Sequence, residues 1–170
     1  CKKAFSNQQS AISNFWLPTA DSRKPKAKIM QNYLLKLADD SLIMGQRLAE
    51  WCGKGPYLEE DIAVSNSALD QLGQANNFYN LAANLFNDGR TADDFAMLRV
   101  EKEYLNAQLV ELPNGDYANT IMKAYFFAVY QNLLYDNLSN SADEELRAIA
   151  QKSLKEVKYH YTHTETWMRI

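Results

Sequence analysis

Residues 58–86 read LEEDIAVSNSALDQLGQANNFYNLAANLF, a stretch with no proline that predicts one long helix. Its residues recur at alternating spacings of four and three, which is the period of one face of an α-helix. We expect this face to be buried in a core; it consists of Leu58, Ile62, Ser65, Leu69, Leu72, Asn76, Tyr79, Ala83 and Phe86. The turn sequence NDGR, residues 87–90, ends the helix. A helix of this length needs other long helices to cover its buried face.

Strong turn signals divide the rest of the chain from residue 29 onward into helical segments. GKGP, residues 53–56, ends the first segment, and LPNGD, residues 112–116, precedes the fourth. Thr91 is the expected N-cap of the third segment, and Ser141 with Glu144 forms a capping box that starts the fifth. We predict long helices at about 29–52, 58–86, 117–138 and 141–170, with a shorter helix at about 93–110. This pattern predicts an all-α fold, an up-and-down four-helix bundle.

The last two long helices each have a stripe of core residues. The stripe of the helix at 117–138 is Tyr117, Ile121, Ala124, Ala128, Gln131, Tyr135 and Leu138. The stripe of the helix at 141–170 is Leu146, Ala150, Ser153, Val157, His160, Thr164 and Trp167. Aromatic side chains nevertheless surround the first of these two helices, and the helix at 29–52 also has two apolar faces. Apolar residues on both sides of a helix favour a subunit of an assembly over a monomer.

Composition and charge exclude several classes of function. Six basic residues and one acidic residue give residues 1–29 a local charge of +5, so residues 30–170 carry −8 of the chain's total of −3. An acidic body argues against nucleic-acid binding, and the chain has no apolar run long enough for a membrane span. Two cysteines cannot form a disulfide framework, which makes a cytoplasmic location the expectation. We predict that residues 1–29 are a flexible or added segment and that residues 30–170 form the helical domain.

A long four-helix bundle raises the question of a di-iron centre. Such centres take one carboxylate from each of two helices and a Glu-x-x-His pair from each of the other two. The chain has only two histidines, His160 and His163, and neither has glutamate three residues before it. A complete centre of this type therefore cannot be built from these residues.

A mononuclear metal site is the alternative that the sequence leaves open. Glu156, His160 and His163 are all common metal ligands and lie on one face of the last helix. Under this hypothesis the protein is a free-standing metal-dependent helical enzyme. We prefer the interpretation that His160 is a buried histidine of the core stripe, with Glu156 and His163 beside it.

Four segments in order carry a resemblance to a known family. They are SLIMGQRLAEWCG (41–53), LDQLGQANNF (69–78), LVELPNGDYANTI (109–121) and KEVKYHYTHTETW (155–167). Together they resemble the PaaC family of subunits of bacterial ring-1,2-phenylacetyl-CoA epoxidases, from about Met30 to Ile170. The resemblance implies a ferritin-like fold whose C-terminal part is missing here.

The resemblance also implies a division of labour between subunits. Members of the family are non-catalytic and pack against a di-iron catalytic subunit, PaaA, which epoxidises phenylacetyl-CoA. The complex also contains a reductase and a small bridging subunit. The resemblance thus implies no cofactor in this chain, iron in the partner subunit, and no catalytic residue here; residues that contact the substrate stay unassigned.

The ligand frame of that di-iron partner can be laid over this chain. Leu42 falls at the first carboxylate position and Ala128 at the carboxylate position of the third long helix. The two Glu-x-x-His positions fall on Leu72 with Ala75 and on Val157 with His160. Five of these six residues are apolar, so the resemblance implies a degenerate centre that binds no metal.

Overall fold

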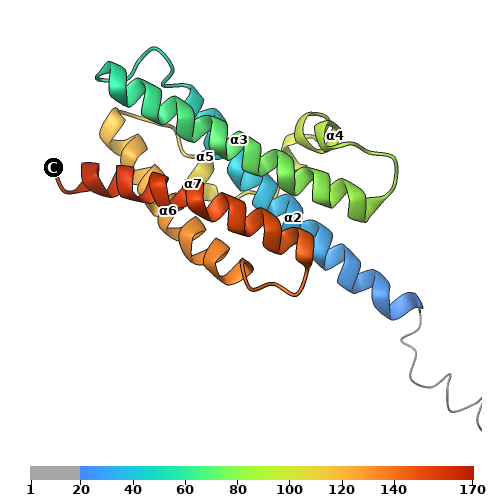
Figure 1. The fold of residues 1–170 in the computed structure, drawn as a ribbon. Helices are drawn as coiled ribbons and strands as arrows, with labels where there is room; N and C mark the ends of the chain where they lie inside the picture. Colours follow the sequence, from blue (N-terminus) through green and yellow to red (C-terminus); the bar gives the residue numbers. More distant parts are fainter. Residues whose placement is uncertain (1–19) are drawn as a thin grey trace, which may run out of the picture.

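Four long helices form the body of the molecule in the computed structural model, which describes residues 20–170. They are α2 (Ala20–Ala49), α3 (Leu58–Phe86), α6 (Tyr117–Leu138) and α7 (Glu144–Met168). Helices α2 and α3 form one antiparallel hairpin, α6 and α7 form another, and α3 packs against α7 between them (Figure 1). Residues 20–170 contain no strand, which confirms the predicted all-α bundle. None of the described helices has the length and apolarity needed to cross a membrane.

The connection between the two hairpins is a crossover. Residues 87–116 return along the bundle, so that α6 starts at the same end as α3 and runs in the same direction (Figure 1). The crossover contains α4 (Ala92–Met97), the single 3₁₀ turn η1 (Glu101–Glu103) and α5 (Gln108–Glu111). Strict up-and-down alternation is therefore limited to the two hairpins, and one crossover of this kind is typical of ferritin-like bundles.

The single predicted helix at 93–110 is wrong, because two buried carboxylates compete for its backbone. The backbone N–H of Leu105 donates to Asp39 Oδ2 at 2.7 Å, and that of Ala107 donates to Asp40 Oδ1 at 2.5 Å. An N–H bound to a carboxylate of α2 is not available to a carbonyl one turn earlier in its own helix. Only the start of this segment follows the prediction, with Thr91 and Asp94 forming a capping box.

The other helix bounds agree closely with the sequence pattern, apart from both ends of α7 and both ends of α2, which ends at Ala49 and not at residue 52. Helices α3 and α6 begin and end at the predicted residues. Helix α7 begins at Glu144 because Asp143, and not Ser141, caps it by accepting the backbone N–H of Leu146 at 2.9 Å, and it ends at Met168. Helix α2 begins at Ala20, inside the predicted N-terminal segment. Residues 1–19 lie outside the described residues, so the division at residue 29 stays a prediction.

The core stripes predicted for α6 and α7 are confirmed. In α7 the buried residues are Leu146, Ala150, Ser153, Val157, His160 and Thr164. In α6 they include Ile121, Ala124, Ala128, Gln131 and Tyr135. Both stripes contain polar members, so the centre of the bundle is polar although its surroundings are apolar.

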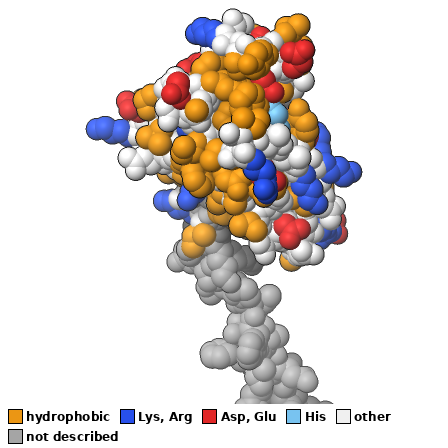
Figure 2. All heavy atoms as spheres, turned by 90° about the vertical axis from the view of Figure 1, so that its left-hand side faces the viewer, with side chains coloured by type: hydrophobic (Ala, Val, Ile, Leu, Met, Phe, Trp, Pro, Cys, Tyr) orange, Lys and Arg blue, Asp and Glu red, His pale blue; other side chains and the backbone are white. Residues whose placement is uncertain are grey.

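The predicted buried face of α3 is wrong in its first half, whereas in its second half Tyr79 is buried and Leu72, Ala83 and Phe86 pack against the core. Leu58, Ile62 and Leu69 are 71, 53 and 66% exposed. Helix α3 instead turns inward a face in which small and amide side chains stand beside a few large apolar ones: Val64, Ser67, Ala68, Gln71, Gln74, Ala75, Phe78, Tyr79, Leu81 and Ala82. Gln71 and Gln74 are buried because both bind Gln131 of α6, which leaves the large apolar residues at the start of α3 outside. Figure 2 looks onto the end where α3 and α6 begin, and hydrophobic side chains cover much of it.

A buried ion pair holds the crossover against α2. Asp39 is fully buried, and its carboxylate accepts from Tyr79 Oη at 2.5 Å, from both terminal nitrogens of Arg99 and from the backbone of Leu105. Arg99 also donates to the carbonyls of Phe95 and Glu103, at 2.5 and 3.0 Å. One guanidinium thus ties α2, α3 and the crossover together.

We predict that Arg99→Met lowers the free energy of unfolding by about 3–5 kcal/mol, because it leaves the Asp39 carboxylate buried without its cation. Urea denaturation followed by circular dichroism measures this change. The control is Arg169→Met, which removes an exposed pair with Glu165 and should change stability by less than about 1 kcal/mol. Equal effects of the two substitutions would contradict the role given to the buried pair.

Candidate functional site

A network of amides and hydroxyls lies at the centre of the bundle. Gln71 of α3 and Gln131 of α6 face each other and exchange two hydrogen bonds, of 2.7 and 3.0 Å. Gln131 Nε2 also lies 3.2 Å from Gln74 Oε1 and 3.4 Å from Ser41 Oγ, and Tyr135 Oη donates to Gln74 Oε1 at 3.1 Å. All five side chains are buried. Three long helices therefore meet through polar groups that satisfy one another without an ion.

His160 brings the fourth helix, α7, into this network. Its Nδ1 lies 3.4 Å from Gln71 Nε2, and its Nε2 lies 3.0 Å from Asp70 Oδ2. Gln71 Nε2 can only donate and the Asp70 carboxylate accepts, so Nδ1 is the acceptor of the ring and Nε2 carries the proton. Both ring nitrogens are thereby engaged, and no lone pair of His160 is free for a metal.

The three residues of the alternative metal site bind three different partners. Glu156 Oε2 accepts from Gln74 Nε2 at 2.9 Å, His160 binds Asp70 and Gln71, and His163 Nε2 donates to Glu60 Oε2 at 2.8 Å. In the described part of the chain, no group of three or more histidine, cysteine, aspartate or glutamate side chains is placed to hold a metal ion. The structure thus does not bring this triad together.

The predicted degenerate positions divide into two groups. Ala75, Ala128, Val157 and His160 are buried among the four helices. Leu42 is also buried but borders an outer groove, and Leu72 packs against α2, where a Cβ added to Gly45 would lie 3.1 Å from the Leu72 side chain.

The polar residues beside these leucines occupy the interior in their place. Ser41 on α2, and Gln71 with Gln74 on α3, point into the network. The network thus uses the residue before each of Leu42, Leu72 and Ala75, and the assignment of the ligand frame stays a prediction. Gln71 and Gln74 keep the i, i+3 spacing of a ligand pair, but both are neutral amides. A search for buried amides at that spacing could have found them in the sequence.

The interior beside the network has almost no free space. A cavity of about 20 Å³ lies between Gln71, His160, His163 and apolar side chains of α2 and α6. This volume holds about one water molecule. A substrate with a ring system cannot enter it.

A second cluster closes the end of the bundle around Glu60. A single oxygen, Glu60 Oε2, accepts from Tyr117 Oη, His163 Nε2 and Trp167 Nε1 at 2.8, 2.8 and 2.9 Å. Tyr117 also packs edge-on against Trp51 and Trp167. Burial raises the pKa of the Glu60 carboxyl, but the hydrogen bonds from Tyr117, His163 and Trp167 outweigh it and leave the pKa below its ordinary value. Nothing in the sequence pattern indicated this cluster, because its members come from α3, α6, α7 and the turn after α2.

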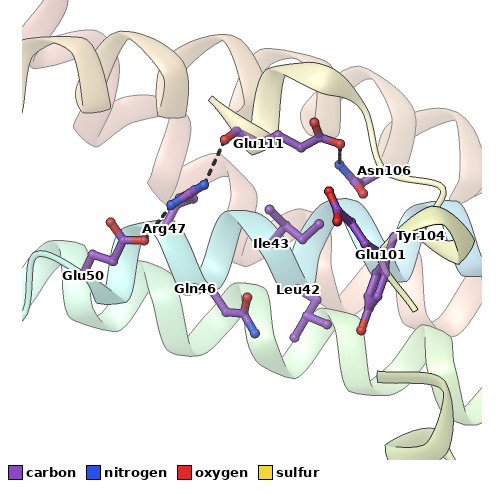
Figure 3. A pocket seen from close by; sticks show the side chains of 9 residues that line it. All are labelled: Leu42, Ile43, Gln46, Arg47, Glu50, Glu101, Tyr104, Asn106 and Glu111. Carbon is purple, nitrogen blue, oxygen red and sulfur yellow. Dashed lines mark hydrogen bonds and ion pairs between the residues drawn. The ribbon is translucent and has the colours of Figure 1, made fainter. Parts of the chain in front are cut away.

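An outer groove of about 590 Å³ lies between α2 and the crossover (Figure 3). Leu42, Ile43 and Tyr104 form its apolar part. Arg47 binds Glu50 at 2.9 Å and donates to the carbonyl of Glu111 at 3.0 Å. The remaining lining residues are Gln46, Glu101 and Asn106. One cation against three carboxylates makes the groove a poor site for a polyanionic ligand such as a coenzyme A ester.

The crossover topology and the polar network at the centre of the four long helices define a ferritin-like four-helix bundle. Within that class, the family model of the phenylacetic acid catabolic proteins matches residues 9–170, and the chain belongs to this family. A curated relative is the PaaC subunit of the 1,2-phenylacetyl-CoA epoxidase of Escherichia coli (strain K12), which is 43% identical over 136 residues. That alignment covers 80% of this chain and 54% of the relative, so the chain spans about half the length of the curated relative it matches.

We predict that the central amides act as a unit in stability. Gln131→Met should lower the free energy of unfolding by about 2–3 kcal/mol, because both polar groups of the Gln71 amide lose a buried partner. Adding Gln71→Met should then change stability by much less than Gln71→Met does alone. Chemical denaturation of the two single variants and the double variant measures this coupling. Gln151→Met, at an exposed position of α7, is the control, and strict additivity would contradict the prediction.

The Glu60 cluster predicts a dependence of stability on pH. The lowered pKa means that Glu60 contributes its full stabilisation above its unfolded-state pKa and loses it as pH falls through its folded-state pKa. Glu60→Gln should therefore be about 1–2 kcal/mol less stable than the wild type at pH 7, with the difference shrinking below about pH 4.5. Thermal unfolding from pH 3 to 8 tests this. The exposed neighbour Glu59→Gln should follow the wild-type profile.

Proposed function

We propose that this protein is a structural, non-catalytic subunit of a phenylacetyl-CoA 1,2-epoxidase complex in phenylacetate catabolism. Its role is to pack against the di-iron catalytic subunit and stabilise it. The family match and the relative that is itself a PaaC subunit of such an epoxidase support this proposal. Because the chain spans about half of that relative, the activity and partners of the whole protein belong to the proposal.

One observation carries the non-catalytic part of the proposal: the centre of the bundle is built from neutral amides. A di-iron site needs hard carboxylate ligands and imidazoles with a free lone pair. The residues that meet there are Ser41, Gln71, Gln74 and Gln131, with His160 as the only imidazole in the network, and both nitrogens of that ring already have partners. Such a centre holds the helices together and leaves oxygen chemistry to another subunit.

The proposal assigns the remaining components by the same division of labour. We expect no cofactor in this chain and iron in the PaaA-like catalytic partner, within a cytoplasmic complex that also contains a reductase and a small bridging subunit. Phenylacetyl-CoA is bound by the complex. The acidic outer groove and the one-water cavity are each poor sites for that substrate.

We predict that the chain co-elutes with a PaaA-like subunit when the two are expressed together. The isolated chain, grown with added iron, should contain only substoichiometric iron, while the catalytic subunit purified in the same way serves as the iron-positive control. Size-exclusion chromatography with metal analysis measures both properties. Two equivalents of iron in the isolated chain, or no complex with the catalytic subunit, would refute the proposed function.

His160→Ala separates this proposal from a free-standing metal enzyme. Under our proposal the variant loses stability, because Gln71 loses a buried neighbour and Asp70 its partner, and its metal content stays unchanged. Under the alternative, which uses Glu156, His160 and His163, the variant loses bound metal and activity together.

A further inference from the structure

The outward face of α6 carries no charged side chain over most of its length. Between Tyr117 and Tyr135 the only charged residue is Lys123. Lys123 is buried, and its ammonium donates to the carbonyl of Leu112 and to Asn114 Oδ1, both at 2.8 Å. Solvent-facing helix surfaces in single-domain proteins normally carry charged residues. The outward face of α6 therefore lacks the charged side chains that a solvent-facing helix surface normally carries.

Large apolar residues replace those charges. Met122, Phe126, Tyr130 and Leu133 follow one another at spacings of four, four and three, so they form one ridge along the helix. They are 44, 53, 41 and 65% exposed. With roughly 200 Å² for a fully exposed side chain of this size, the ridge leaves about 400 Å² of mostly apolar surface uncovered. That is about half of the surface that each partner contributes to a standard subunit interface.

The aromatic members of the ridge are held in place by their neighbours. Phe126 packs edge-on against Tyr125 at 5.8 Å between ring centroids, and Tyr125 stacks on Tyr161 of α7 at the same distance. Tyr130 packs on the buried ring of Phe127 at 6.2 Å. Rigid, half-exposed aromatic side chains lose little entropy on binding and commonly dominate interface energies.

The neighbouring helix α7 shows what a solvated face of this bundle looks like. Lys152, Lys155 and Lys158 recur there at spacings of three and are exposed. The two helices thus differ in character, and only α6 presents an uncharged ridge.

We infer that the ridge Met122–Phe126–Tyr130–Leu133 is the docking surface for a helix of a different subunit, the di-iron catalytic subunit of the proposed function, on which this inference rests. A ridge at helical spacing packs into the groove between side-chain rows of another helix. The uncovered area of the ridge matches the apolar centre of a subunit interface. A polar rim around such a centre supplies the rest of the interface area. The curated relative is one of several kinds of subunit in its enzyme, which favours a different subunit over a second copy.

The test compares two leucines with the same exposure on different helices. Leu133→Lys places a charge in the ridge, and Leu69→Lys places one on α3, where Leu69 is 66% exposed against 65% for Leu133. Affinity for the purified catalytic subunit is measured by calorimetry with the full chain. We expect Leu133→Lys, alone or with Phe126→Lys, to weaken binding at least tenfold, and Leu69→Lys to leave it within about twofold of the wild type.

Any other outcome contradicts either the proposed function or the proposed docking surface. If the wild-type chain does not bind the catalytic subunit, the proposed function fails. If the wild type binds and Leu133→Lys binds equally well, the docking surface is wrong while the function stands. Light scattering that shows a homodimer disrupted by Leu133→Lys assigns the ridge to a second copy and overturns the inference. A lowered melting temperature of Leu133→Lys without partner assigns the ridge to the same polypeptide and also overturns it.

Discussion

The buried carboxylate of Asp39 is the constraint from which the arrangement of the helices follows. A fully buried charge must find a cation and several hydrogen-bond donors within reach. Asp39 finds them in Arg99, Tyr79 and the backbone of Leu105, and this requirement draws the crossover against α2. Because the crossover returns along the bundle, α6 starts at the same end as α3 and runs parallel to it. That direction places Gln131 opposite Gln71.

The centre of the bundle follows a different electrostatic rule. An amide both donates and accepts, so Gln71, Gln74 and Gln131 satisfy one another without any net charge. Carboxylates at the same places would repel one another unless cations lay between them. The charged groups next to the network, Asp70 and Glu156, bind its outer members His160 and Gln74. Hydrogen bonds between these amides thus connect the helices in the way that shared ligands do in a metal centre.

Local signals predicted the helices well, and the contacts between distant residues account for what they missed. The bounds of α3 and α6, and the core stripe of α7, follow from turn residues and a period that tertiary contacts do not alter. The first half of the face of α3 was predicted wrongly because hydrophobicity alone ranks Leu69 above Gln71. Gln71 is buried only because Gln131 is its partner. For the same reason the sequence pattern pointed to Leu42 and Leu72, whereas the polar residues beside them, Ser41 and Gln71, meet in the interior.

Helix α6 places polar side chains among the apolar residues of its inner face and large apolar side chains on its outer face. Its inner face carries Gln131, Thr120 and Lys123, while Phe126 and Leu133 face outward. In an isolated bundle each of these outward residues would expose apolar surface that no neighbour covers. The inward polar residues gain partners from the other helices, so their burial is favourable. The outward residues gain nothing comparable until a second body covers them. A chain with a polar network in its core and an uncovered apolar ridge on α6 fits the supporting role that we propose for it.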